Sequence, residues 1–174
     1  MRLTVNGLEQ EISSPPLTAL LHVLREELEI TSPKAGCQQG GCGTCTVLVD
    51  GEPRRSCLTA VATVDGAAIT TLEGLGEAES MSPVQAAFHN LYAAQCGFCT
   101  PGMILAATAL IERKGGPVER KEVLDALGGH YCRCTGYVKI VDAVMAASRG
   151  EVEPVADLPA AEGEPDVLVK GSPA

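Results

Sequence analysis

Three cysteines lie in the glycine-rich segment 36–45, and a fourth follows as Cys57. The spacing of Cys37, Cys42, Cys45 and Cys57 is Cys-x4-Cys-x2-Cys-x11-Cys, which is the plant-type ligand pattern of a [2Fe–2S] cluster. Such a cluster must be wrapped by backbone, with thiolates pointing inward and N–H groups approaching the inorganic sulfides, and glycine allows the tight turns that this requires. The segment is therefore predicted to be a cluster-binding loop.

A structural zinc ion and a disulfide are the alternatives for these cysteines. A zinc knuckle accounts for Cys42 and Cys45 but explains neither Cys37 nor the density of glycine in the loop. No basic segment followed by an apolar stretch precedes the first strand pattern, so we expect a cytoplasmic protein whose thiols stay reduced. Under those conditions metal binding is favoured over a disulfide framework.

Charge argues against binding of nucleic acid, and hydropathy argues against a membrane-spanning segment. The net charge is −9, whereas binding of nucleic acid needs a basic surface, so nucleic acid is not expected as a partner. The apolar runs are amphipathic or too short for a bilayer, so no membrane span is expected. Hydrophobic residues make up 45% of the 174 residues, which is enough for one large core or two small ones.

Residues 1–75 are predicted to form a small mixed sheet crossed by one helix. The pairs Asn-Gly at 6–7 and Asp-Gly at 50–51 tolerate positive φ, and each separates two strand-like runs. Leucines recur at helical spacing over residues 17–28, which predicts an amphipathic helix. The expected strands cover residues 3–5, 9–12, 46–49, 52–53 and 67–71. With the cysteine loop, this order resembles the β-grasp of plant-type ferredoxins, an inference from pattern together with analogy.

From Ser80 onward the sequence has helical periodicity. Ser82 is predicted as a helix N-cap with Pro83 at the first helical position, and Thr100-Pro101 repeats that pair before a second helix. Two Gly-Gly pairs are predicted to end helices. The expected helices cover residues 83–94, 103–113, 118–127 and 137–148. Residues 80–148 are therefore predicted to be a four-helix bundle domain, which makes the whole chain an α+β protein.

A second set of four cysteines falls at the joints between these helices. Cys96 and Cys99 form a Cys-x2-Cys pair, and Cys132 and Cys134 follow as Cys-x-Cys after a gap of 32 residues. A four-cysteine zinc site is the main alternative to a cluster here. The Cys-x-Cys spacing weakens it, because zinc sites usually need at least two residues between paired ligands, whereas a two-iron cluster is larger.

Two longer motifs surround this second set. Residues 95–102 read Gln-Cys-Gly-Phe-Cys-Thr-Pro-Gly, and residues 132–137 read Cys-Arg-Cys-Thr-Gly-Tyr. Behind the first cysteine loop, these runs closely resemble the small iron–sulfur subunit of the xanthine oxidase family of molybdenum hydroxylases, over residues 1–148. The resemblance implies a β-grasp domain with one [2Fe–2S] cluster on the first four cysteines. It implies a four-helix domain with a second cluster on Cys96, Cys99, Cys132 and Cys134.

The resemblance also implies a role in electron transfer within a larger complex. A large subunit would carry molybdenum with a pterin dinucleotide, and usually a medium subunit would carry FAD. Single electrons would pass from the molybdopterin site through two clusters to FAD or an external acceptor, and this chain alone would catalyse nothing. Gln95 and Cys134 match the residues that lie against the pterin. A free-standing two-cluster ferredoxin and a zinc-binding assembly module are the alternatives.

Two positions depart from the family's pattern. Residues 38–39 are Gln-Gln where an acidic residue is common, which is expected to shift the reduction potential of the first cluster. Residues 130–131 are His-Tyr where Asn-Leu is common, and His130 is expected to take the place of Asn by hydrogen-bonding backbone. Residues 149–174 contain four prolines and six carboxylates without periodicity, and are expected to form an extended or disordered acidic tail.

Overall fold

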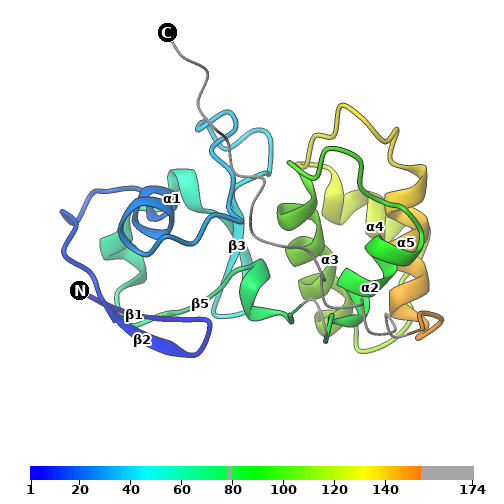
Figure 1. The fold of residues 1–174 in the computed structure, drawn as a ribbon, viewed down its shortest axis with the longest axis horizontal. Coiled ribbons are helices and arrows are strands. Elements are labelled where there is room, and N and C mark those ends of the chain that lie inside the picture. The colour runs from blue at the N-terminus through cyan, green and yellow to red at the C-terminus, as the bar shows by residue number, and fades with distance from the viewer. Residues whose placement is uncertain (78–79, 154–174) are drawn as a thin grey trace, which may run out of the picture.

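The computed structural model describes residues 1–77 and 80–153, in which a five-stranded mixed sheet lies beside a group of helices (Figure 1). The strands are β1 (Arg2–Val5), β2 (Leu8–Glu11), β3 (Thr46–Val49), β4 (Glu52–Arg55) and β5 (Ala68–Thr70). They lie in the order β2-β1-β5-β3-β4, with β1 and β5 parallel and the other neighbours antiparallel. The mixed sheet predicted from the sequence is therefore confirmed.

Both hairpins turn on the dipeptides that the sequence predicted. In the first turn φ is 50° at Asn6 and 82° at Gly7, and in the second it is 49° at Asp50 and 82° at Gly51. Positive φ at both central residues is the geometry of a primed turn, whose twist matches that of the strands it joins. These two turns fix the register of β1 on β2 and of β3 on β4.

The helix predicted over residues 17–28 is shorter and less regular than expected. Helix α1 spans Leu20–His22 and continues as a π-helical turn over Val23–Glu27. Ala19 before it is extended, with ψ at 134°, and Leu17 is 87% exposed, so placing Leu17 on the apolar face was wrong. The buried leucines of this segment begin at Leu20, where the backbone becomes helical, and Leu20 and Leu24 pack in one core with residues of the sheet.

Glu27, at the end of this π-helical turn, ties it to the segment that follows β2. Its carboxylate accepts hydrogen bonds from the backbone N–H of Ser13 (2.6 Å) and the hydroxyl of Ser13 (2.7 Å). It also accepts from the backbone N–H and the hydroxyl of Ser14. The hydroxyl of Ser14, followed by the N–H and hydroxyl of Ser13, lowers the pKa of Glu27 to about 2. The ionised carboxylate therefore stabilises the folded chain.

Replacing Glu27 with Gln is expected to lower the free energy of unfolding by about 1 kcal/mol at pH 7, because an amide presents one acceptor oxygen where the carboxylate presents two. The folded pKa lies below the unfolded one, so this contribution is complete above about pH 4.5 and is lost as the pH falls towards 2. Urea unfolding of the wild type and E27Q at pH 7 and pH 3 measures this contribution of Glu27 to the free energy of unfolding. The E27Q deficit should shrink at pH 3, and the control E29Q, at an exposed position, should show no deficit at either pH.

The second part of the chain consists of α2 (Pro83–Asn90), α3 (Thr100–Lys114), α4 (Arg120–Leu127) and α5 (Val138–Ser148). These helices share one apolar core. Ser82 caps α2 as predicted, since its hydroxyl accepts from the Gln85 N–H (3.3 Å) and its own N–H donates to the Gln85 side chain (2.8 Å). Gly115, with φ at 66°, ends α3.

Two details of these helices differ from the prediction. Helix α2 ends at Asn90 and not near residue 94, because Tyr92 takes a left-handed conformation with φ at 54°. Thr100 lies inside α3, and Cys99 is its N-cap residue without a side-chain hydrogen bond. A candidate cluster ligand therefore stands at the N-terminus of a 15-residue helix, where the backbone N–H groups and the helix dipole favour negative charge.

The two parts of the chain meet where α3 packs against β3 (Figure 1). Leu48, Leu105 and Ala109 form a small buried cluster at this joint. A Cβ atom added to Gly102 in the first turn of α3 would lie 2.3 Å from the carbonyl oxygen of Gly43. Only glycine allows the helix to approach the first cysteine loop this closely.

The segment predicted to be an acidic tail, residues 149–174, is described only as far as Glu153. The side-chain amide of Asn90 donates to the backbone oxygen of Glu153 (3.0 Å), which holds this end beside α2. The rest of the predicted tail, residues 154–174, lies outside the described residues. In the described ranges, no helix has the length and hydropathy needed to cross a membrane.

Candidate metal centres

The first four predicted ligands come together in the loop that leads into β3 and in the turn that follows β4. Cys37 is exposed, Cys42 and Cys57 are half-buried and Cys45 is buried. The sulfur of Cys42 accepts from the N–H of Cys37 (3.4 Å) and lies 3.2 Å from the hydroxyl of Thr44. The loop thus aims backbone N–H groups and a hydroxyl at its sulfurs, as a sulfur-ligated cluster requires.

Electrostatics differ across this first set. The N–H of Gln39, which donates to the sulfur of Cys37 (3.4 Å), and the neighbouring Cys42 lower the pKa of Cys37 to about 7. Burial and the adjacent thiol of Cys45 raise the pKa of Cys57 to about 11. Neighbouring thiols oppose a second ionisation because like charges repel. Binding of a cation removes this repulsion, which is why ligation and loss of the thiol protons are coupled.

The second four predicted ligands also come together, from two separate segments, 96–99 and 132–134. Cys96 and Cys134 are exposed, Cys132 is half-buried and Cys99 is buried. The sulfurs of Cys96 and Cys134 lie 3.6 Å apart. Burial and the nearby thiol of Cys132 raise the pKa of Cys99 to about 12.

Thr135 organises the sulfur of Cys132. Its N–H and its hydroxyl donate to that sulfur at 3.4 Å and 3.1 Å. Burial would raise the pKa of Cys132, but these hydrogen bonds outweigh it and the pKa is lowered. Tyr137 fixes the same segment, because its hydroxyl accepts from the N–H of Cys132 (2.8 Å) and lies 3.3 Å from the backbone oxygen of His130.

Both sets arrange their thiols in pairs. Within residues 1–77 and 80–153, no three His, Cys, Asp or Glu side chains gather closely enough around one point to hold a single metal ion. The contacts above pair Cys37 with Cys42 and Cys96 with Cys134, and Cys45 with Cys57 and Cys99 with Cys132. A [2Fe–2S] cluster takes four thiolates, two on each iron, so this donor set fits it.

Gln95, the other predicted site residue, is exposed and precedes Cys96. In the part of the chain that the structure describes, its side-chain amide has no hydrogen-bond partner. Because α2 ends at Asn90, Gln95 does not cap that helix. The amide is therefore free to bind a group outside the chain, on the side of the molecule where Cys96 and Cys134 are exposed.

The sequence analysis missed a buried polar contact between the two cysteine sets. His130 is only 3% exposed. Its Nε2 lies 3.0 Å from the hydroxyl of Thr46, a side-chain contact that the sequence did not predict. Arg55 donates to the same hydroxyl (2.6 Å) and to the backbone oxygen of Gly129 (2.9 Å). Burial and then the charge of Arg55 lower the pKa of His130 to about 4, which keeps the imidazole neutral near pH 7.

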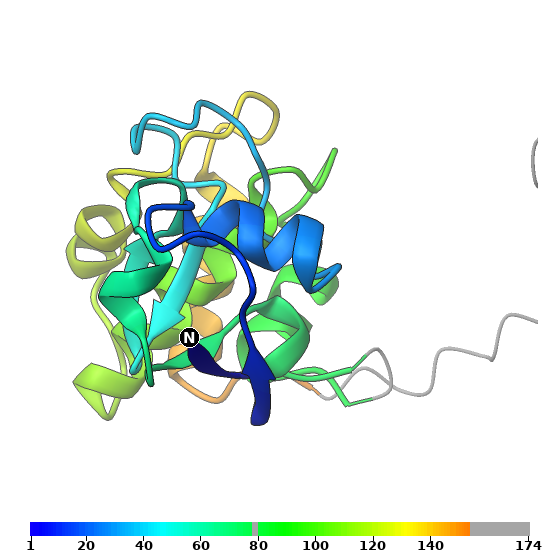
Figure 2. The same ribbon diagram turned by 90° about the vertical axis from the view of Figure 1, so that its left-hand side faces the viewer.

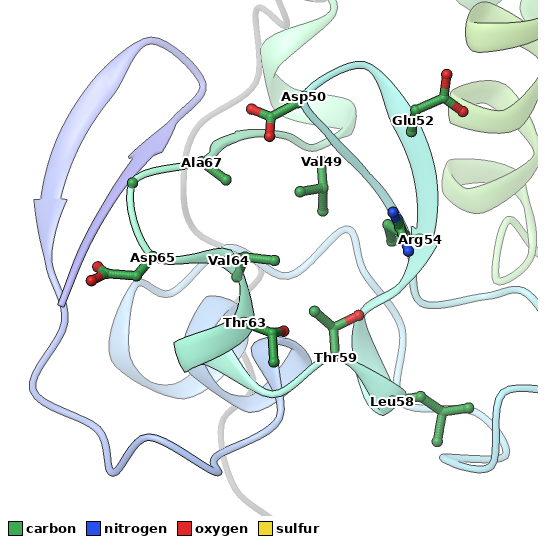
Figure 3. Close-up of a pocket in the computed structure, with 11 residues that line it drawn as sticks. Val49, Asp50, Glu52, Arg54, Leu58, Thr59, Thr63, Val64, Asp65 and Ala67 are labelled. Carbon is green, nitrogen blue, oxygen red and sulfur yellow. The ribbon is translucent and has the colours of Figure 1, made fainter.

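A separate hollow of about 640 Å³ lies beside β3 and the turn after Cys57. Figure 3 shows the residues that line it. The carboxylates at its rim already have partners in this chain. Asp50 accepts from the N–H of Ala68 (2.9 Å), and Asp65 accepts from the N–H of Arg2 (2.8 Å). None of its lining residues is a cysteine, so it belongs to neither candidate centre.

Two family profiles match adjoining parts of the chain. A 2Fe-2S iron-sulfur cluster binding domain matches residues 3–70, and a [2Fe-2S] binding domain matches residues 71–145. Each half of the chain is therefore a [2Fe–2S]-binding domain, and the prediction of two clusters is confirmed at that level.

Several known proteins are similar over most of the chain. The nicotine 6-hydroxylase small subunit of Paenarthrobacter nicotinovorans is 45% identical over 143 residues, which is 82% of this chain and 86% of that one. The crystal structure of quinoline 2-oxidoreductase from Pseudomonas putida 86 matches with a TM-score of 0.79 at 42% identity, over 87% of this chain and 98% of the matched chain.

A third relative is much longer than this chain. The aldehyde oxidoreductase of Megalodesulfovibrio gigas is 46% identical over 149 residues, which is 84% of this chain but only 16% of that protein. The same iron–sulfur unit thus occurs as a separate small subunit in one relative and as part of a longer polypeptide in another. The chain belongs to the small [2Fe–2S] subunits of the xanthine oxidase family of molybdenum hydroxylases.

Proposed function

We propose that this chain is the electron-transfer subunit of a molybdenum hydroxylase complex. It would relay single electrons from a molybdopterin site on a large partner subunit to FAD on a medium subunit, or to an external acceptor. The observation that carries the proposal is the arrangement of eight thiols as two neighbouring pairs in each [2Fe–2S]-binding half. Its relatives include a nicotine 6-hydroxylase small subunit, a nicotinate dehydrogenase small FeS subunit and a xanthine dehydrogenase iron-sulfur-binding subunit, which supports a role as one part of an oxidoreductase.

The ligands follow from the two sets of thiols. Cys37, Cys42, Cys45 and Cys57 would hold the first cluster, and Cys96, Cys99, Cys132 and Cys134 the second. Such clusters supply reversible one-electron reduction. The residues of this chain supply the donors, the surrounding N–H and hydroxyl groups and the partial exclusion of water. Buried Cys45 and Cys99 anchor each cluster to the core, while exposed Cys37 and Cys134 face the surroundings.

The finer architecture belongs to the same proposal. Residues 1–75 would be a β-grasp ferredoxin-like domain and residues 80–148 a four-helix cluster-binding domain, followed by an acidic tail over 149–174. The sheet order with parallel β1 and β5 supports the first assignment, and the core shared by α2 to α5 supports the second. Free thiols as ligands favour a reducing compartment, so a cytoplasmic location is part of the proposal.

Gln95 and Cys134 are the proposed contacts to the pterin of the large subunit. The side-chain amide of Gln95, which has no hydrogen-bond partner within residues 1–77 and 80–153, offers a donor and an acceptor, which suits the amide-like edge of a pterin. A thiolate sulfur can accept from an exocyclic amine. Cys134 lies 3.6 Å from Cys96, the neighbour of Gln95, so both residues belong to one exposed area. Electrons would therefore enter through the helical half.

Replacing Gln95 with Ala should slow reduction of the helical-half cluster by substrate about tenfold, because one bidentate contact contributes roughly 1.4 kcal/mol. A single-turnover absorbance measurement on the complex tests this. Iron content and reduction by dithionite should not change, because Gln95 is no ligand. Unchanged substrate-driven reduction would remove the support for this entry point. If the iron-loaded chain purifies without any large subunit, a free-standing ferredoxin becomes the better assignment.

A further inference from the structure

We propose that Arg55 and His130 are positioning residues that hold the two cysteine sets at a fixed separation, an inference that rests on the proposed electron-transfer function. Both views of the molecule place the loop 36–45 and the segment 128–136 at the same end (Figures 1 and 2). The N–H of Tyr131 donates to the backbone oxygen of Cys42 (3.0 Å). Cys42 belongs to the first set, and Tyr131 precedes Cys132 of the second.

Side chains from both halves enclose this backbone contact. From β4, Arg55 reaches across to the backbone oxygen of Gly129 (2.9 Å). From the helical half, His130 reaches back to Thr46 at the start of β3 (3.0 Å). The hydroxyl of Thr46 in turn donates to the backbone oxygen of Gly43 in the cysteine loop (2.6 Å). The network therefore connects Gly43, which follows Cys42, with Gly129 and His130, which precede Tyr131.

The network is tight as well as polar. A Cβ atom on Gly43 would lie 2.5 Å from the imidazole of His130, and one on Gly129 would lie 2.6 Å from the guanidinium of Arg55. Arg55 thus packs directly against Gly129, whose backbone oxygen it binds, and His130 packs against Gly43, whose backbone oxygen is bound by Thr46. The Nδ1 atom of His130 has no hydrogen-bond partner among the described residues, so the hydrogen bonds of the network are those of Arg55, of Thr46 and of the Nε2 atom of His130. Buried hydrogen bonds that link several segments favour one arrangement of the surrounding backbone.

Adhesion between the halves does not depend on this network alone. The apolar cluster of Leu48, Leu105 and Ala109 joins β3 to α3 independently. Removal of Arg55 or His130 should therefore leave the halves associated while the loop and the segment 128–136 move relative to each other. Electron tunnelling between two centres depends steeply on their separation, so a fixed separation has a functional consequence that stability alone does not explain.

The test uses the iron-loaded protein with any subunits that accompany it, fully reduced with dithionite. R55M is compared with R54M, the neighbouring exposed arginine on β4, and H130A with the wild type. We expect R55M and H130A to lose or markedly change the spin–spin splitting between the two reduced clusters in electron paramagnetic resonance, at unchanged iron content. Amide exchange over residues 129–131 should become at least tenfold faster. R54M should match the wild type in both measurements.

The outcomes separate this inference from the proposed function. Unchanged splitting and exchange in iron-replete R55M and H130A would overturn the positioning role alone. A wild-type chain that binds no iron would overturn the proposed function together with it. If R55M fails to fold, R55K provides the comparison, because it keeps the charge but cannot bridge Thr46 and Gly129 at once. Wild-type splitting in R55K would overturn the role of the arginine.

Discussion

Replacing Cys42 with Ser is expected to lower the iron content from about four to about two atoms per chain, with an equal loss of acid-labile sulfide. The mutation removes one thiolate of the first set, and the other set lies on separate segments with its own hydrogen bonds. One of two electron paramagnetic resonance signals from the reduced complex should therefore be lost or strongly altered. The other should keep its intensity.

The matched replacement Cys96→Ser should give the reverse result, because Cys96 belongs to the second set. Iron and sulfide analysis with visible absorption measures both variants against the wild type. Loss of both signals from a folded C42S protein would show that the two sites are not independent. Two zinc ions per wild-type chain without visible absorption would contradict the assignment of clusters altogether.

The sequence predicted the parts of the fold that are coded locally. Asn6-Gly7 and Asp50-Gly51 encode their own turn geometry, and Ser82 with Gln85 encodes a capping box. The ligand pattern of the first cysteine set is also encoded locally, because Cys37, Cys42, Cys45 and Cys57 lie close together in the sequence. Such features need no knowledge of distant residues, because each residue's backbone preference already agrees with the final structure.

The errors arose where tertiary contacts decide the local structure. Leu17 has the right spacing for an apolar helix face, yet the chain remains extended at Ala19 and leaves Leu17 exposed. Tyr92 ends α2 through a positive φ that is uncommon for a bulky residue and that periodicity does not indicate. Local patterns therefore located these helices but misplaced their ends.

The contact between Arg55 and His130 could not be read from either residue's surroundings in the sequence. The two positions are 75 residues apart, and they meet only because α3 packs on β3. An arginine before Cys57 and a histidine before Cys132 each have an ordinary surface explanation. Only Gly102 offers a partial signal, since a glycine within a helix can mark close approach of another chain segment, whereas Gly43 and Gly129 are already explained by the turns in which they lie.

Replacing Gly43 with Ala is expected to lower the free energy of unfolding by about 3 kcal/mol or more. Gly43 has φ at 76°, where an L side chain is strained. Its added Cβ would also lie 2.5 Å from the ring of His130 and 2.6 Å from the backbone oxygen of Gly129. The backbone oxygen cannot move without displacing the segment that leads to Cys132, so the loop itself must shift.

Gly41 provides the matched control in the same loop. A Cβ atom there would meet nothing within 4 Å, and its φ does not lie in the left-handed region. G41A should therefore unfold at a urea concentration close to that of the wild type, with its iron retained, whereas G43A should unfold much earlier and lose iron. Equal destabilisation by both substitutions would mean that the loop rejects any methyl group. In that case the requirement for glycine at position 43 would not come from its close contact with the segment before Cys132.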